Sequence, residues 1–271
     1  PLPYVLGALT HYSFSVVPIH AIEKFGKDWT KPENFVGNGP FRLESWKPQD
    51  RVTVVPNEKY WDRKSVKLGR VVYLPGDDNN TAFRMYENKE IDWLTNVPTG
   101  QMDAVKGRPD FQSAPRLGSY YYIPQIQRPP LNDVRVRKAL ALSFNRKDLV
   151  EKIVKGGEVP ALTMVPPMAG YPAVKGNAED VAKAKQMLTE AGFPGGKGFP
   201  KLQILYNTSE AHKKIGEFVQ QQWKENLGIE VELLNQEWNT YLDNKANHKF
   251  DLARAGWIGD YVDPNTFLDM W

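Results

Sequence analysis

Apolar residues recur along the chain with two alternating periods, one typical of strands and one typical of helices. In the C-terminal part the order is a strand at 201–206, a helix at 209–228, a strand at 229–236, a helix at 237–246 and a strand at 249–257. The longest of these helices has an apolar stripe on one face and a glycine directly after its end. Because strands that alternate with helices pair in parallel and are covered by those helices, this part predicts an α/β layer.

The N-terminal part carries shorter strand patterns separated by turn residues. Residues 40–47 (PFRLESWK) and 51–57 (RVTVVPN) flank a short polar link, and together they predict a β-hairpin. Residues 71–75 predict another strand, residues 79–90 a helix, and residues 91–96 (IDWLTN) a further short strand.

The middle of the chain combines one extended run with several helical patterns. The run YYYIPQIQ at 120–127 predicts a strand. Helices are predicted at 132–144, with Asn or Asp as the N-cap, at 145–157, ending in two glycines, and at 178–192.

The length of 271 residues suffices for two domains, and the change of pattern near residue 119 divides the chain into 1–118 and 119–271. The chain begins at Pro1 rather than at Met, and the segment TFLDMW at 266–271 does not end in a terminating pattern. We therefore expect a fragment of a longer mature protein, without its signal peptide.

The composition excludes several classes of protein. The net charge of +3 is too small to indicate a nucleic-acid partner or an anionic membrane surface. Without cysteine there are no disulfides, thiolate metal sites or catalytic thiols. The four histidines lack metal-ligand spacing, no nucleotide-binding motif occurs, and no apolar run approaches the ~20 residues that cross a bilayer. We therefore expect no metal and no cofactor.

The segment DLARAGWIGDYVDP, residues 251–264, has the strongest candidate chemistry. It follows the last predicted strand, and ligands of parallel sheets gather at the carboxyl ends of strands. Asp260 in a cleft would pair with an ammonium group, Gly256 would allow a ligand close to the backbone, and Trp257 would form a flat wall. A purely structural role, in which a strand leads into a turn, explains the same residues. A further alternative is a hydrolase that uses Asp260 and Asp263 as its pair of catalytic carboxylates.

Other candidates follow neighbouring strands. Asn207 and His212 lie where the long helix begins, and that end of a helix suits a carboxylate. Trp238 follows the next strand, and Tyr121 takes the face opposite Tyr120. Plain helix capping and ordinary core packing explain these residues equally well, so the residues alone leave both readings open.

Five blocks carry a resemblance to a known family. They are the segments 36–62 (VGNGPFRLESWKPQDRVTVVPNEKYWD), 129–150 (PPLNDVRVRKALALSFNRKDLV), 205–214 (LYNTSEAHKK), 235–243 (NQEWNTYLD) and 251–269 (DLARAGWIGDYVDPNTFLD). In this order they resemble the periplasmic oligopeptide-binding proteins, the solute receptors of ATP-driven peptide importers. The oligopeptide branch is matched more closely than the dipeptide, nickel or haem branches.

The resemblance implies an α/β fold of the two-lobed periplasmic-binding-protein type, in the class with an extra domain. Residues 1–118 would be part of the first lobe and 119–271 most of the second. It implies a monomeric, periplasmic or extracellular receptor without catalytic activity, whose parent protein is associated with the membrane. Short peptides would bind in extended form, and the permease subunits of an ABC importer would be the partners. Other cargoes, such as a dipeptide, a metal chelate, haem or an oligosaccharide, remain alternatives.

The resemblance also assigns roles to individual residues. Asp260 would meet the α-ammonium of the peptide, and Gly256, Trp257 and Ile258 would supply backbone bonds and a pocket wall. The remaining members of the predicted site are wall residues or residues that meet carboxylates, namely Trp238, Tyr121, Arg254, His212, Asn207 and Lys245. Lys245 stands where relatives carry Arg, so it would attract a carboxylate without the bidentate fork.

Overall fold

The computed structural model describes residues 3–76, 78–172 and 174–271. The chain forms two compact units, one of Leu9–Asp77 and one of Pro1–Ala8 together with Asp78–Trp271. The sequence analysis divides the chain after residue 118, whereas the smaller unit already ends at Asp77. The assignment of 1–118 and 119–271 to two lobes therefore stays a prediction.

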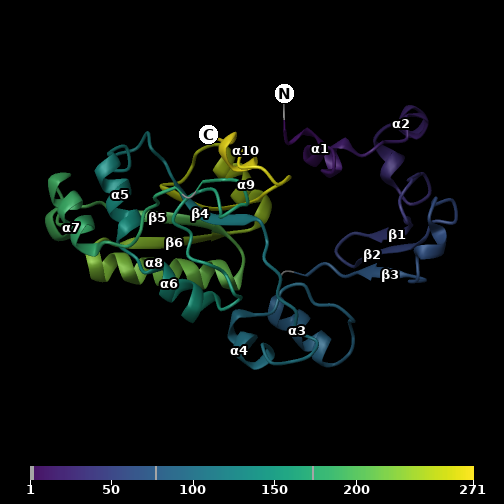
Figure 1. The fold of residues 1–271 in the computed structure, drawn as a ribbon, viewed down its shortest axis with the longest axis horizontal. Coiled ribbons are helices and arrows are strands. Elements are labelled where there is room, and N and C mark those ends of the chain that lie inside the picture. The colour runs from purple at the N-terminus through teal and green to yellow at the C-terminus, as the bar shows by residue number, and fades with distance from the viewer. Residues whose placement is uncertain (1–2, 77, 173) are drawn as a thin grey trace. The chain divides into compact units, whose positions relative to one another are not determined.

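The larger unit is built on a four-stranded sheet (Figure 1). Its strands are β4 (Gly118–Pro124), β5 (Leu202–Asn207), β6 (Val231–Gln236) and β7 (Leu252–Ile258), in the order β4-β7-β5-β6. β5 runs parallel to β6 and to β7, while β4 is antiparallel to β7. The predicted α/β layer is confirmed, with one antiparallel strand added at its edge.

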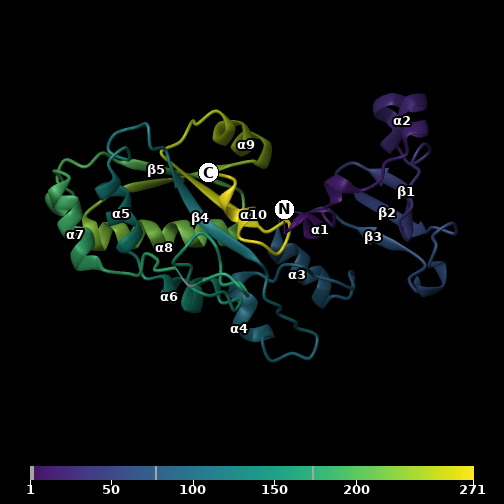
Figure 2. The same ribbon diagram turned by 45° about the horizontal axis from the view of Figure 1, so that its top comes forward.

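Helices cover both faces of this sheet (Figure 2). On one face, α5 (Val134–Leu142), α7 (Val181–Glu190) and α8 (Glu210–Leu227) share a hydrophobic cluster with Ile204 of β5. On the other face, α9 (Trp238–Ala246) contributes Tyr241 to a second cluster that contains Leu205. Since Ile204 and Leu205 are neighbours in one strand, their side chains point to opposite faces, which explains the two clusters.

The helix ends in this unit follow the capping residues of the sequence. The side chain of Asp133 accepts a hydrogen bond from Arg135 N, and that of Ser209 accepts one from His212 N. Gly228 ends α8 in the left-handed conformation at φ 70°. The expected helix at 145–157 runs as α6 (Arg146–Asp148) and a π-helix (Leu149–Val154), and Lys155 at φ 62° ends it before the two glycines.

The predicted strand at 91–96 is wrong, because these residues belong to no helix or strand. Trp93 is 77% exposed, so the short apolar run has no buried face and pairs with no neighbouring strand. The remaining elements of the larger unit are short. They are α1 (Val5–Ala8), α3 (Asn79–Glu87), η4 (Thr99–Gln101), α4 (Met102–Val105), η6 (Pro194–Gly196) and α10 (Asn265–Leu268).

The smaller unit contains an antiparallel sheet in the order β1-β2-β3. The predicted hairpin is confirmed as β1 (Phe41–Lys47) and β2 (Arg51–Pro56), and the strand after it is β3 (Val71–Tyr73). The buried Asn57 side chain donates to the carbonyl oxygens of Gly37 and Gly39, at 3.1 and 3.0 Å, and so holds the loop that enters β1. The helical segments here are η1 (Tyr12–Phe14), α2 (Ile19–Phe25), η2 (Gly26–Thr30) and η3 (Arg63–Ser65).

Candidate ligand-binding site

Arg254, in the middle of β7, is the charged centre of the site. Its Nη1 donates to Asn207 Oδ1 at 3.3 Å, and its guanidinium carbon lies 4.9 Å from the centroid of the Tyr120 ring. Its Nε is buried and has no hydrogen-bond partner among the residues that the structure describes. Within the same described ranges, no ion pair joins Arg254 to a carboxylate. A half-buried cation without a counter-charge and with an unsatisfied donor is unusual in a folded protein.

His212, in the first turn of α8, lies against the same group of side chains. Its Nδ1 is 3.4 Å from the hydroxyl oxygen of Tyr120, and the two rings lie 5.6 Å apart. Burial, and secondly the positive charge of Arg254, lower the pKa of His212 to about 4. The imidazole is therefore neutral at pH 7. Burial also raises the pKa of Tyr120 to about 12, so its hydroxyl keeps its proton.

Helix α9 brings a second cation towards Arg254. Burial and the charge of Arg254 lower the pKa of Lys245, in the last turn of this helix. The helix is attached to β7 by Tyr241, whose hydroxyl donates to the main-chain oxygen of Arg254. Tyr241 in turn stacks on Trp238, with ring centroids 5.5 Å apart, and Trp238 remains 50% exposed. The helix thus presents an aromatic surface and a positive charge beside the strand.

These contacts define what we call the cationic cluster, consisting of Arg254, Asn207, His212, Tyr120 and Lys245. Its members come from β4, β5, β7, α8 and α9 and meet at the carboxyl end of β5. The cluster offers free donor capacity, positive charge and a neutral imidazole. It is suited to holding an anion, above all a planar carboxylate that a guanidinium binds through two hydrogen bonds.

The loop after β7 carries the predicted ammonium partner. Trp257 Nε1 and the main-chain nitrogen of Asp260 both donate to the hydroxyl oxygen of Thr266, at 3.3 and 3.1 Å. The expectation of an enclosed Asp260 is not met in this chain, because Asp260 is exposed, as are Gly256 and Ile258. The physical reason for Asp260 is that it lies beyond Ile258, the last residue of β7 that pairs with β4.

Two candidates lie apart from the cationic cluster. The ring of Tyr121 packs edge-on against Trp271, with centroids 5.9 Å apart, on the face opposite Tyr120. Asp263 shapes the turn before α10, because its Oδ1 accepts a hydrogen bond from Asn265 N at 2.9 Å. This hydrogen bond gives Asp263 a structural role in the turn.

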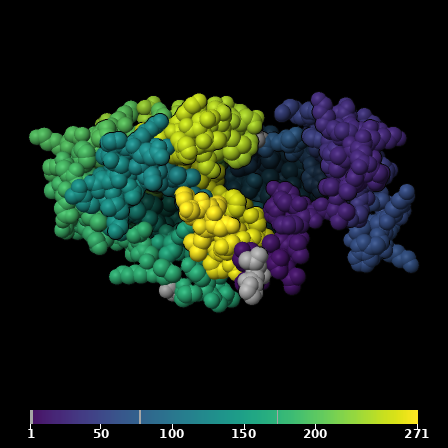
Figure 3. Space-filling view, turned by 90° about the horizontal axis from the view of Figure 1, so that it is seen from above, coloured from purple at the N-terminus to yellow at the C-terminus, as the bar shows by residue number. Residues whose placement is uncertain are grey.

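In the space-filling view, α9 and the C-terminal residues, yellow-green to yellow, lie next to one another (Figure 3).

Sequence reasoning missed the roles of three residues. Tyr120 was not among the predicted site residues, yet its ring lies under the Arg254 guanidinium. Tyr241 had only its helical spacing as a signal, and Thr266 had none, because a threonine in a short loop is common.

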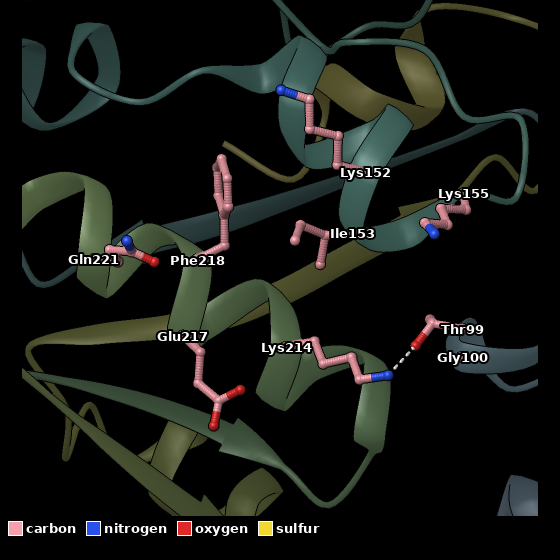
Figure 4. A pocket seen from close by; sticks show the side chains of 9 residues that line it. All are labelled: Thr99, Gly100, Lys152, Ile153, Lys155, Lys214, Glu217, Phe218 and Gln221. Atoms are coloured by element: carbon pink, nitrogen blue, oxygen red, sulfur yellow. Dashed lines mark hydrogen bonds between the residues drawn. The ribbon is translucent and has the colours of Figure 1, made fainter.

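A separate pocket of about 350 Å³ lies between η4, the π-helix and α8 (Figure 4). Its lysines are neutralised by their surroundings: Lys214 pairs with Glu210 at 2.6 Å and bonds to Thr99 at 2.7 Å, and Lys155 pairs with Asp103. The pocket shares no residue with the cationic cluster and has no unpaired charge to attract an anion. It is therefore the weaker candidate for a ligand site.

Across the described ranges, no group of three or more His, Cys, Asp or Glu side chains is placed to hold a metal ion. No helix in the same ranges is both long enough and apolar enough to span a bilayer.

A mixed α/β sheet with a cationic cluster at the carboxyl end of a parallel strand is an arrangement typical of ligand-binding α/β proteins. The sequence profile of the bacterial extracellular solute-binding proteins, family 5 Middle, matches residues 1–271, so the chain belongs to this family. This result confirms the resemblance found in the sequence.

Named relatives agree with the assignment. The chain is 39% identical to the periplasmic oligopeptide-binding protein OppA of Salmonella typhimurium over 99% of its own length and 51% of the relative. It is 38% identical to the periplasmic murein peptide-binding protein MppA of Escherichia coli over 100% of its length and 52% of the relative. The crystal structure of a periplasmic oligopeptide-binding protein of Borrelia burgdorferi matches with a TM-score of 0.92 and 40% identity, over 100% of this chain and 54% of that one. The predicted fold class is confirmed, and the chain spans about half the length of the relatives it matches.

Proposed function

We propose that the full-length protein is an extracytoplasmic receptor that binds short peptides in extended form and delivers them to an ATP-driven importer. The family and the named relatives support a peptide cargo. The observation that carries the proposal is that Arg254, in the cationic cluster, forms no ion pair with a carboxylate of the described residues, which leaves its positive charge for a peptide carboxylate.

The second anchor of the proposed site is Asp260. Six positions separate it from Arg254 in the sequence, so the two Cα atoms lie within about 21 Å of each other. A short extended peptide spans such a distance, with its carboxylate towards Arg254 and its α-ammonium towards Asp260. The side chain of Asp260 is exposed in this chain. In the full-length protein, the ligand and the remaining part of the chain would cover it.

Main-chain contacts would supply much of the remaining affinity. At Gly256, a Cβ would be in van der Waals contact with the site, 3.5 Å from Arg254 Nη2 and 3.4 Å from the carbonyl oxygen of Ser119. Glycine keeps this stretch open for a peptide that adds to the strand end as a further strand. Trp257, the exposed Ile258 and the half-exposed Trp238 would form walls that tolerate many side chains, with Tyr121 as a further wall.

The receptor is proposed to act as a periplasmic monomer without catalytic activity, with permease subunits as its partners. A cationic cluster alone would accept the carboxylate of many cargoes, including chelates and haem. What favours peptides is the addition of an ammonium partner, Asp260, in the loop that follows the strand of Arg254. Mass spectrometry of a tripeptide after incubation separates the receptor from a hydrolase, since a receptor returns its ligand intact.

The test uses isothermal titration calorimetry on the full-length protein. A tripeptide and its N-acetylated form are titrated into the parent protein and into Asp260→Asn. Each change alone should weaken binding by about 10-fold or more, and together they should weaken it no further, because both remove the same ion pair. Asp269→Asn, an exposed carboxylate in the following turn, is the matched control for charge and should bind like the parent. Equal affinity of Asp260→Asn and the parent for the tripeptide would refute the assignment.

A further inference from the structure

Thr266 is a buried residue of α10, the short helix that directly follows the loop after β7. Its exposed fraction is 3%. Its single hydroxyl oxygen accepts hydrogen bonds from Trp257 Nε1 at 3.3 Å and from the main-chain nitrogen of Asp260 at 3.1 Å. The two donors belong to the aromatic wall and to the ammonium partner of the proposed site. One atom therefore determines the positions of both.

The methyl group of Thr266 has a separate role. A Cβ built on Gly259 would lie 3.1 Å from Thr266 Cγ2 and 3.0 Å from Leu117 Cδ2, so the loop backbone passes tightly between these two side chains. Gly259 N also donates to Leu117 O at 2.9 Å. The methyl group thus limits movement of the loop towards α10, while the hydroxyl group orients the residues on either side of Gly259.

Thr266 is itself held in place independently of any ligand. Its main-chain nitrogen donates to Asp263 O at 3.2 Å, and the next residue, Phe267, is completely buried. Because the support of Thr266 lies in the folded core, the two hydrogen bonds to its hydroxyl group exist before a ligand arrives.

We propose that Thr266 is a positioning residue for ligand binding, whose hydroxyl oxygen keeps the Trp257 ring and the Asp260 main chain at a set spacing in the ligand-free protein. This inference rests on the proposed function, because it assumes that Trp257 and Asp260 contact the same bound peptide. A prepositioned loop loses less conformational entropy on binding, and the affinity for the ammonium end of the peptide rises accordingly.

Two variants separate the oxygen from the methyl group. Thr266→Val keeps the shape and removes the acceptor, so Trp257 Nε1 and Asp260 N lose their partner. Thr266→Ser keeps the acceptor and removes the methyl group. Thr189→Val is the control, because the Thr189 hydroxyl bonds only to Lys185 O of its own helix, α7, in the described part of the chain.

Calorimetry with the full-length protein then compares a tripeptide with its N-acetylated form. Thr266→Val should lower the affinity for the tripeptide about 10-fold or more. It should lower the affinity for the acetylated form less than about 3-fold, because the acetylated form does not use Asp260. Thr266→Ser and Thr189→Val should bind both peptides within about 3-fold of the parent. A purely structural role predicts equal losses for both peptides, and that result, or unchanged binding by Thr266→Val, would overturn the inference.

A measurement on the unmodified protein covers the case in which the valine variant does not fold. Hydrogen exchange by NMR reports on the Asp260 amide and on the Trp257 indole N–H, whose resonance is assigned with Trp257→Phe. Both protons should be protected without ligand, and rapid exchange of either one contradicts prepositioning. The same measurements distinguish this inference from the proposed function. If Asp260→Asn lowers the affinity for the tripeptide but Thr266→Val does not, the role of Thr266 is refuted and the proposed function stands.

Discussion

Replacing Arg254 by Met should separate binding from stability. Methionine has a similar length and no charge, so the side chain still fills its space over the Tyr120 ring. The substitution removes the hydrogen bond to Asn207, worth about 0.5–1.5 kcal/mol, and the cation–π contact, worth about 0.5–2 kcal/mol. It also removes a buried Nε without a partner, whose burial costs about 1–3 kcal/mol.

These contributions to folding oppose each other and are similar in size. The free energy of unfolding of Arg254→Met should therefore differ from that of the parent by no more than about 2 kcal/mol. Binding has no such compensation, because the ligand carboxylate loses its charged partner. We expect a loss of about 2–5 kcal/mol, or roughly 30-fold to several thousand-fold in affinity.

The assay pairs urea denaturation with calorimetry, using a tripeptide and its C-amidated form. The parent should strongly prefer the free carboxylate, and Arg254→Met should bind both forms with similar affinity. Arg146→Met is the matched control, because Arg146 also has a buried guanidinium nitrogen without a partner in the described residues and stacks on Phe144, 4.2 Å from the ring centroid. It lies outside the cationic cluster and should leave affinity unchanged.

One result would refute this reasoning. If Arg254→Met lost several kcal/mol of stability but still preferred the free carboxylate, the guanidinium would be a structural group and not an anion site. A second readout is the pKa of His212, measured by NMR. Without the positive charge of Arg254 this pKa should rise from about 4, but burial, the larger cause, should keep it below the ordinary value.

Two further predictions concern stability. The pKa of His212 is about 4 in the folded protein and about 6.5 when unfolded, so the unfolded chain takes up a proton first as the pH falls. The unfolding free energy should therefore decrease from pH 6.5 to 4 in urea titrations; His212→Gln should flatten this decrease, and the exposed His248→Asn should not. Gly228→Ala places a Cβ 2.3 Å from Gly195 O at φ 70°, whereas Gly192→Ala, at φ 97°, meets open space. We expect Gly192→Ala to cost about 1–2 kcal/mol and Gly228→Ala clearly more, and equal costs would contradict the packing argument.

Local sequence was sufficient for most helices and strands. The period of apolar residues placed all four strands of the larger sheet, and Asp133, Ser209 and Gly228 act as the caps that their residue types indicate. Local sequence failed at 91–96, where an apolar run resembles a strand but finds no neighbour to pair with. A strand forms only when a second strand satisfies its backbone, and this condition is not local.

The site depended on tertiary structure to a greater degree. The sequence already singled out Arg254, His212 and Asn207, but only strand order and register decided that they meet over Tyr120. The register pairs Tyr122 with Arg254 and Tyr120 with Gly256, so Tyr120 shares the face of Arg254 and Tyr121 takes the other. Likewise, the sequence was sufficient to select Asp260 as a candidate carboxylate. Its exposure and the hydrogen bond from its main-chain nitrogen to Thr266 are known only from the structure. Periodicity records which way a side chain faces within its own element. The neighbours that determine its charge state and its partners come from elements far away in the chain, and only folding brings them together.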